Sequence, residues 1–180
     1  MKISKPLATA HLRAMALVHS DRALNYEERL FILQNFHEGA EHMNAKTGAF
    51  FTPYDLAKDF AINVGDAKRV IDLCAGIGML SFAVDWEVRG TEMVCVELNA
   101  EYVTVGKRVM PKATWIHADV CTYPMDHLGR FACAISNPPF GRVGTTAQKE
   151  DGLHRSRIRV PHHRGSVQLR RPRGLYPSSR

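Results

Sequence analysis

The sequence predicts an α/β protein built on a parallel, doubly wound β-sheet, with a helical segment in front of it. From Lys68 onward, short β-type runs alternate with segments of helical pattern. Strands that alternate with helices indicate a parallel sheet that is covered on both faces. A glycine-rich stretch at the first strand-to-helix junction, DLCAGIG, fits the same architecture.

The length and composition are those of a single globular domain. With 180 residues, the chain can bury a sizeable core. Its apolar runs are all shorter than the roughly 18–20 residues that a membrane helix needs. Its first residues, MKISKPLATAHLRAM, are too polar for a secretory signal. We therefore expect a cytoplasmic protein with no membrane partner.

The four cysteines form no CxxC pair, and three of them stand in apolar, strand-like runs. Free thiols in such runs behave as small core residues. We favour that role over metal ligation or disulfide bonding, and we expect no metal site.

The net charge of +6 comes from the end of the chain. From Gly141 onward there are ten basic residues and two acidic ones, out of totals of 24 and 18. This leaves 14 basic and 16 acidic residues in the preceding part, which is close to neutral. A basic footprint for nucleic acid would therefore belong to the tail.

The elements of the N-terminal half are expected to be helical. Residues 1–46 carry apolar side chains at roughly helical spacing, and Asn25 can cap a helix. Gly48 then breaks the pattern. Thr52 is the expected N-cap of a further helix, with Pro53 at its first position, that runs to about Asn63.

The second half carries the sheet. The expected strands are RVIDLCA, EMVCVEL, ATWIHADV and FACAISN, and the expected helices begin at GIGML and at AEYVTVGKRVM.

Three strand ends carry candidate ligand-binding groups. The stretch from Asp72 to Gly78 allows a ligand to approach the backbone and a helix N-terminus. Glu97 ends the second strand, where an acid can accept both hydroxyls of a ribose. Asp119 closes the third strand and could accept from an adenine amine. Each of these features also has a purely structural explanation. The glycines could serve packing alone, Glu97 could be a solvated carboxylate, and Asp119 could cap a turn.

The fourth strand is followed by Asn-Pro-Pro-Phe, residues 137–140. In isolation this tetrapeptide would be a stiff turn or a strand terminator. Its place after the fourth strand, with a glycine loop at the first and an acid at the second, favours a catalytic loop.

With these motifs, the chain resembles the class I S-adenosylmethionine-dependent methyltransferases, and among them the enzymes that modify adenine N6 in DNA. AFFTPYDLA is similar to a segment of the modification subunits of restriction–modification systems. The resemblance covers about residues 45 to 144 and implies a Rossmann-like methyltransferase sheet. It implies that S-adenosyl-L-methionine is bound by Asp72, Ala75, Gly76, Gly78, Glu97, Leu98, Asp119, Val120, Phe51, Thr52 and Pro53. It implies catalysis by Asn137, Pro138, Pro139 and Phe140.

The implied reaction is a direct in-line methyl transfer to the N6 amine of an adenine flipped out of DNA. Asn137 and Pro138 would accept the amine hydrogens, the prolines would pre-order the loop, and Phe140 would stack on the base. Related loops act on guanine in RNA or on glutamine in proteins, and these substrates stay open. A specificity subunit or another partner subunit is also expected. The alternative from another class is a non-catalytic module that binds nucleotide or nucleic acid through its Arg-rich tail.

The alternation of apolar strand-like runs and helical segments stops at the point where a fifth strand is expected. We expect an N-terminal helical segment at 1–46, an incomplete S-adenosylmethionine-binding core at 47–144 and an irregular basic tail at 145–180. Either the tail is native, or the reading frame has shifted shortly after Gly144; the codons of the gene decide between the two. Without later strands, the fourth strand would lie at an exposed edge, and this chain alone would have weak activity or none.

Overall fold

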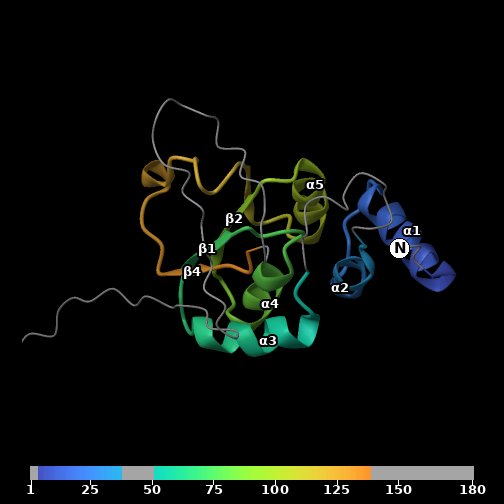
Figure 1. Cartoon of the computed structure of the whole chain (residues 1–180). Helices are drawn as coiled ribbons and strands as arrows, with labels where there is room; N and C mark the ends of the chain where they lie inside the picture. The colour runs from blue at the N-terminus through green and yellow to red at the C-terminus, as the bar shows by residue number, and fades with distance from the viewer. Residues whose placement is uncertain (1–3, 38–50, 139–180) are drawn as a thin grey trace, which may run out of the picture.

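The central element is a parallel sheet of four strands, in the order β3-β2-β1-β4. The computed structural model describes residues 4–37 and 51–138. The strands are β1 (Arg69–Leu73), β2 (Glu92–Glu97), β3 (Thr114–His117) and β4 (Cys133–Ile135). Figure 1 shows β1 in the middle of the sheet, between β2 and β4. The predicted α/β fold class, a Rossmann-like methyltransferase sheet with helices in front of it, is confirmed.

The helices that follow β1 and β2 cover one face of the sheet. They are α4 (Met79–Glu87) and α5 (Ala100–Val109), and α3 (Tyr54–Ala61), extended by the 3-10 turn η2 (Ile62–Val64), packs against α4. The main core lies between these helices and the sheet, and it includes Val70, Met93 and Ile135. A smaller cluster around Ile71, Val94 and Val96 occupies the other face. There the chain between β3 and β4, which contains η3 (Met125–Leu128), supplies the packing.

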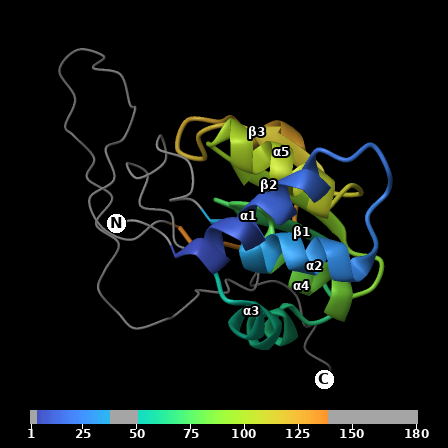
Figure 2. The same ribbon diagram turned by 90° about the vertical axis from the view of Figure 1, so that its right-hand side faces the viewer.

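Two N-terminal helices, α1 (Lys5–Val18) and α2 (Tyr26–Asn35), pack against this core (Figure 2), and their buried side chains, including Val18 and Ile32, are part of it. As expected, Asn25 caps α2: its side chain accepts from the Glu28 N–H, and the Glu28 carboxylate accepts from the Asn25 N–H. Arg108 of α5 donates to the carbonyl oxygens of Val18, Ser20 and Arg22. These bonds attach the connection between α1 and α2 to the core.

Several element boundaries differ from those predicted. Pro53, not Thr52, is the N-cap of α3, because its ψ of 144° is extended while its carbonyl already accepts from the Ala57 N–H. Helix α3 ends at Ala61 and the 3-10 turn η2 continues it to Val64, so the helical segment does end near Asn63, as predicted. The strands are shorter than their apolar runs, so that Asp119 lies two residues beyond the end of β3 at His117.

Some predictions fall outside the described residues: the end of the N-terminal segment, the tail with its missing strands or shifted frame, and Pro139 and Phe140 of the tetrapeptide. The division into 1–46, 47–144 and 145–180 also stays a prediction. In the part of the chain that the structure describes, no helix has both the length and the apolar character to cross a membrane.

Candidate active site

The candidate site lies at the carboxyl ends of β1, β2 and β4. In an open parallel sheet, ligands bind in the crevice outside these ends, at the point where the strand order reverses. Here the chain runs outward from β1 to β2 and β3, and it returns to place β4 on the other side of β1. The loops after β1 and β4 therefore meet at this point.

The loop after β1 is a tight turn made of left-handed residues. Cys74, Gly76 and Gly78 have φ of 70°, 59° and 96°. The backbone N–H groups of Cys74 and Ala75 both donate to the Val96 carbonyl at 3.0 Å, which fixes the turn to β2. Gly78 is the N-cap of α4. The turn thus presents backbone at a helix N-terminus, as a negatively charged or polar ligand group requires.

Glu97 connects this turn to the end of β2. Its carboxylate accepts from the Gly76 N–H at 2.8 Å and from the Asn99 N–H at 2.7 Å, and the residue is 9% exposed. Each carboxylate oxygen can accept more than one hydrogen bond, so Glu97 can hold the loop and still accept from a ligand hydroxyl. The next residue, Leu98, is 55% exposed and offers an apolar surface beside that carboxylate.

Asp72 lies beneath the turn and is 1% exposed. Its Oδ2 accepts from the Ser81 hydroxyl at 2.7 Å, while its Oδ1 is buried with no hydrogen-bond partner among the described residues. Burial, opposed by the Ser81 bond and reinforced by the charge of Glu97, raises the pKa of Asp72 to about 7. A cationic ligand group beside this carboxyl would stabilise its charged form and give Oδ1 a hydrogen-bond donor.

Asp119 and Val120 lie farther along the same edge. The Asp119 side chain accepts from the Cys121 N–H at 2.9 Å, so it does cap the turn that follows β3. The sequence allowed either turn capping or adenine binding for Asp119, and the structure contains the turn cap. Val120 is half-buried in the smaller apolar cluster.

The segment before α3 reaches two parts of the site. A Cβ added to Gly76 would lie 3.4 Å from the Phe51 ring, which also packs edge-on against Phe36 and Tyr102. Thr52 accepts at 2.9 Å from the side-chain amide of Asn137. The predicted neighbours of the cofactor, Phe51 and Thr52, are therefore brought to the glycine turn and to Asn137 of the predicted catalytic loop.

Asn137 and Pro138 follow β4 after one residue, Ser136. The Ser136 hydroxyl donates to the carbonyl of Leu73, at the end of the neighbouring β1. Asn137 thus stands beside the glycine turn, and Pro138 is half-buried next to it.

Two serines of the candidate site, Ser81 and Ser136, were not predicted from the sequence. Ser81 is a fully buried hydroxyl within the apolar run MLSFAV. A polar residue in such a run needs a buried partner, and this was the available signal. Ser136 has no comparable signal, because a serine before Asn-Pro is common in turns.

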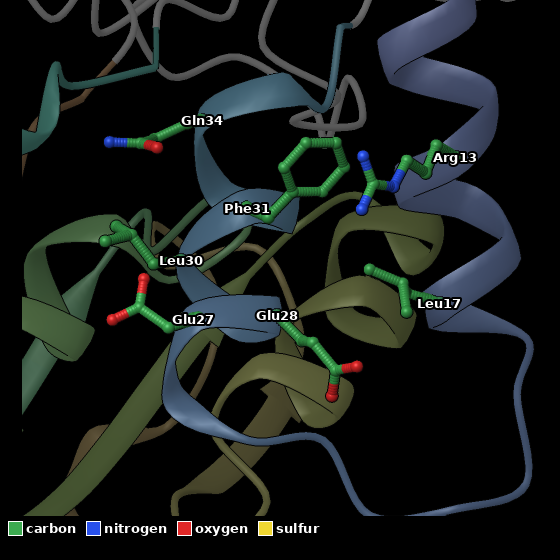
Figure 3. A pocket seen from close by; sticks show the side chains of 7 residues that line it. All are labelled: Arg13, Leu17, Glu27, Glu28, Leu30, Phe31 and Gln34. Atoms are coloured by element: carbon green, nitrogen blue, oxygen red, sulfur yellow. The ribbon is translucent and has the colours of Figure 1, made fainter.

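One hollow lies apart from this site. Figure 3 shows it, and the described residues that line it belong to α1 and α2 (Arg13, Leu17, Glu27, Glu28, Leu30, Phe31 and Gln34). It contains no residue predicted for the site. Within residues 4–37 and 51–138, no three His, Cys, Asp or Glu side chains come together as a metal site would require.

Comparison with known proteins identifies the family. The model of the methyltransferase small domain matches residues 54–153, more than half of the 180-residue chain. The chain belongs to this methyltransferase family. The matched residues include the glycine turn, Glu97 and the tetrapeptide at 137–140, and membership supports the expected cofactor, S-adenosyl-L-methionine. Among curated proteins, no relative matches the chain.

The methyltransferase is also similar to solved structures. A candidate RNA methyltransferase from Pyrococcus horikoshii is 23% identical with a TM-score of 0.49, and the alignment covers 76% of this chain and 63% of that one. The N-terminal domain of EvdMO1 with SAH bound is 23% identical with a TM-score of 0.46, over 73% and 53% of the two chains. The glycopeptide N-methyltransferase MtfA in complex with S-adenosyl-L-methionine is 23% identical with a TM-score of 0.39, over 46% and 39%. The chain thus spans under two thirds of the length of these structures.

The residues of the candidate site fit the expected cofactor. The left-handed turn leads into the N-terminus of α4, where the first N–H groups have no intrahelical partner. Glu97 provides acceptors for hydroxyls, and the unsatisfied Oδ1 of Asp72 suits a buried ammonium.

Proposed function

We propose that this methyltransferase transfers a methyl group from S-adenosyl-L-methionine to the exocyclic N6 amine of adenine in DNA. The observation that carries the proposal is the place of Asn137: it follows β4 and lies beside the glycine turn, with its amide bonded to Thr52. This arrangement brings an acceptor for a planar amine next to the cofactor loop.

The chain would hold its cofactor at three strand ends. Asp72 and the turn at Ala75, Gly76 and Gly78 would bind the methionine portion, and Glu97 would accept from the ribose hydroxyls. Leu98, with Asp119 and Val120 farther along the edge, would line the adenine. Bound there, S-adenosyl-L-methionine supplies an electrophilic methyl group on a sulfonium.

The loop after β4 would prepare the acceptor nitrogen. The lone pair of an exocyclic amine is delocalised into the aromatic ring, which makes the amine a poor nucleophile. Hydrogen bonds from its N–H groups to the Asn137 side-chain oxygen and the Pro138 carbonyl would draw the nitrogen toward a tetrahedral form. Pro138 and Pro139 restrict the loop, so these acceptors need little reorganisation as charge develops. Phe140 would stack on the flipped base.

DNA is the proposed acceptor because of the phenylalanine at position 140 and the FFTP segment at 50–53. The FFTP segment is similar to that of the modification subunits of restriction–modification systems, so we assign site recognition to a partner or specificity subunit. A DNA acceptor also agrees with the expected cytoplasmic location.

The test is transfer of labelled methyl to DNA, with RNA and protein as parallel acceptors and mass spectrometry to identify the modified group. We expect N6-methyladenine, and we expect Asn137→Ala to lower kcat by about 10²–10³-fold through loss of a preorganised acceptor. Asn63→Ala is the matched control, because Asn63 is exposed and bonds only locally to Asp59 and Phe60 among the interactions described.

Methylation confined to RNA or protein would refute the DNA acceptor while leaving the methyltransferase intact. A chain that binds no S-adenosyl-L-methionine would refute the proposal as a whole.

A further inference from the structure

The contact between Thr52 and Asn137 has a role of its own in the proposed reaction. We infer that Thr52 is a positioning residue, which sets the orientation of the Asn137 carboxamide toward the acceptor amine. The inference rests on the proposed function and adds to it a residue that touches neither the methyl group nor the base.

The contact is short and buried on the Thr52 side. The Asn137 amide nitrogen donates to Thr52 Oγ1 at 2.9 Å, across 85 residues of sequence. Thr52 is only 8% exposed, so water competes little for this hydroxyl. A hydrogen bond that is sheltered in this way holds a side chain better than one at the surface.

The orientation matters because the two arms of a carboxamide are chemically opposite. One arm donates through nitrogen and the other accepts through oxygen. With the nitrogen directed at Thr52, the oxygen occupies the other arm, and oxygen is the atom that an amine N–H needs. An inverted carboxamide would direct its own N–H groups at the N–H groups of the substrate.

Both ends of the contact belong to anchored segments. The backbone before Asn137 is held by β4 and by the Ser136 hydroxyl bond to Leu73. Thr52 itself is held between Phe51, which packs on the glycine turn, and Pro53, which caps α3. A rigid acceptor therefore faces an anchored loop, which is what positioning requires.

The test compares the full chain with Thr52→Val and Thr52→Ser. Valine keeps the shape of threonine and removes the hydroxyl, whereas serine keeps the hydroxyl. Thr91→Val is the matched control, because the equally buried Thr91 hydroxyl bonds to Ala67 and Val88 before the start of β2, away from the site. Circular dichroism verifies folding, calorimetry measures affinity for S-adenosyl-L-methionine, and initial rates separate kcat from KM.

We expect Thr52→Val to lower kcat about 10- to 100-fold, with KM for the acceptor close to wild type. The calorimetric affinity for S-adenosyl-L-methionine separates this effect from the role as a cofactor neighbour that the resemblance implies. Thr52→Ser should recover most of kcat, and Thr91→Val should keep it. The side-chain amide resonances of Asn137, assigned by their loss in Asn137→Ala, should shift in Thr52→Val and stay in place in Thr52→Ser.

The failures are distinguishable. If the wild-type chain transfers methyl and Thr52→Val has the same kcat, or if Thr52→Ser is as slow as Thr52→Val, the role of Thr52 is refuted and the proposed function stands. If the wild-type chain neither binds the cofactor nor transfers methyl, the proposed function fails and this inference fails with it.

Discussion

At the scale of single residues, Asp72 combines a deep position with few partners. Its carboxyl is buried beneath the glycine turn, and Ser81 is its side-chain hydrogen-bond donor. A neighbouring carboxylate, Glu97, adds repulsion rather than compensation. The pKa of Asp72 is therefore raised to about 7. Without a cation beside it, the charged form of this carboxyl is unfavourable in the folded chain.

Stability should fall with rising pH because of this residue. The folded pKa of about 7 lies above the ordinary value of 3.8, so between these values the folded chain binds more protons than the unfolded chain. The contribution is complete below about pH 4 and is lost as pH rises through 7. We expect Asp72→Asn to reduce the loss between pH 5 and pH 8, on the order of a few kcal/mol, in denaturant titrations without cofactor. Equal pH slopes for the two proteins would contradict this.

At the scale of elements, α5 depends on a glycine for its approach to β3. A Cβ on Gly106 would lie 2.2 Å from the ring of Trp115, far inside contact distance. The indole covers the helix at that point, and its N–H donates to the Met110 carbonyl at 3.3 Å. The close packing of the two elements therefore requires the absence of a side chain at 106.

We expect Gly106→Ala to lower the free energy of unfolding by about 1–3 kcal/mol through overpacking, although alanine favours helix elsewhere. Thr104→Ala is the control, because Thr104 is on the same helix, exposed, and bonded only to Ala100 among the interactions described. Urea denaturation measures both. A Gly106→Ala protein as stable as the control would mean that Trp115 does not lie against the helix.

The type of the elements and their order along the chain could be predicted, because alternating apolar runs and helical periods are local signals. Boundaries could not, because apolar side chains continue past the last ladder bond, as Cys74 and Ala118 do beyond β1 and β3. The N-cap at Pro53 was misplaced by one residue, since threonine is the better cap by type. The link from Thr52 to Asn137 was not predictable, because it depends on tertiary placement.

At the scale of the whole molecule, the N-terminal helices share the main apolar core with the sheet domain, and polar contacts between described residues add to this attachment. Arg108 donates to the carbonyls of Val18, Ser20 and Arg22 and to the Ser20 hydroxyl. Tyr26 adds a bond of 2.6 Å to the hydroxyl of Tyr54 and packs on Phe82 and Trp86. These contacts join α2 to α3, α4 and α5.

We expect Arg108→Ala to make local opening of α1 and α2 more frequent while the sheet stays closed. Three carbonyls would lose a charged donor, at about 1.5–3 kcal/mol for a typical bond of this kind. Hydrogen exchange should then become faster in α1 and α2 and stay unchanged in β1 and β2. Lys107→Ala, a neighbouring exposed cation, is the control. Uniform acceleration over all elements would contradict a separate attachment.

The bond between Thr52 and Asn137 also sets an order of assembly. The glycine turn closes over a separation of 21 residues, between Gly76 and Glu97, whereas the bond from Thr52 to Asn137 spans 85. Short closures cost less entropy and form sooner. The contact between the turn and Glu97 needs no residue of the fourth strand, whereas the contact at Thr52 does. The glycine turn can therefore close before Asn137 reaches Thr52.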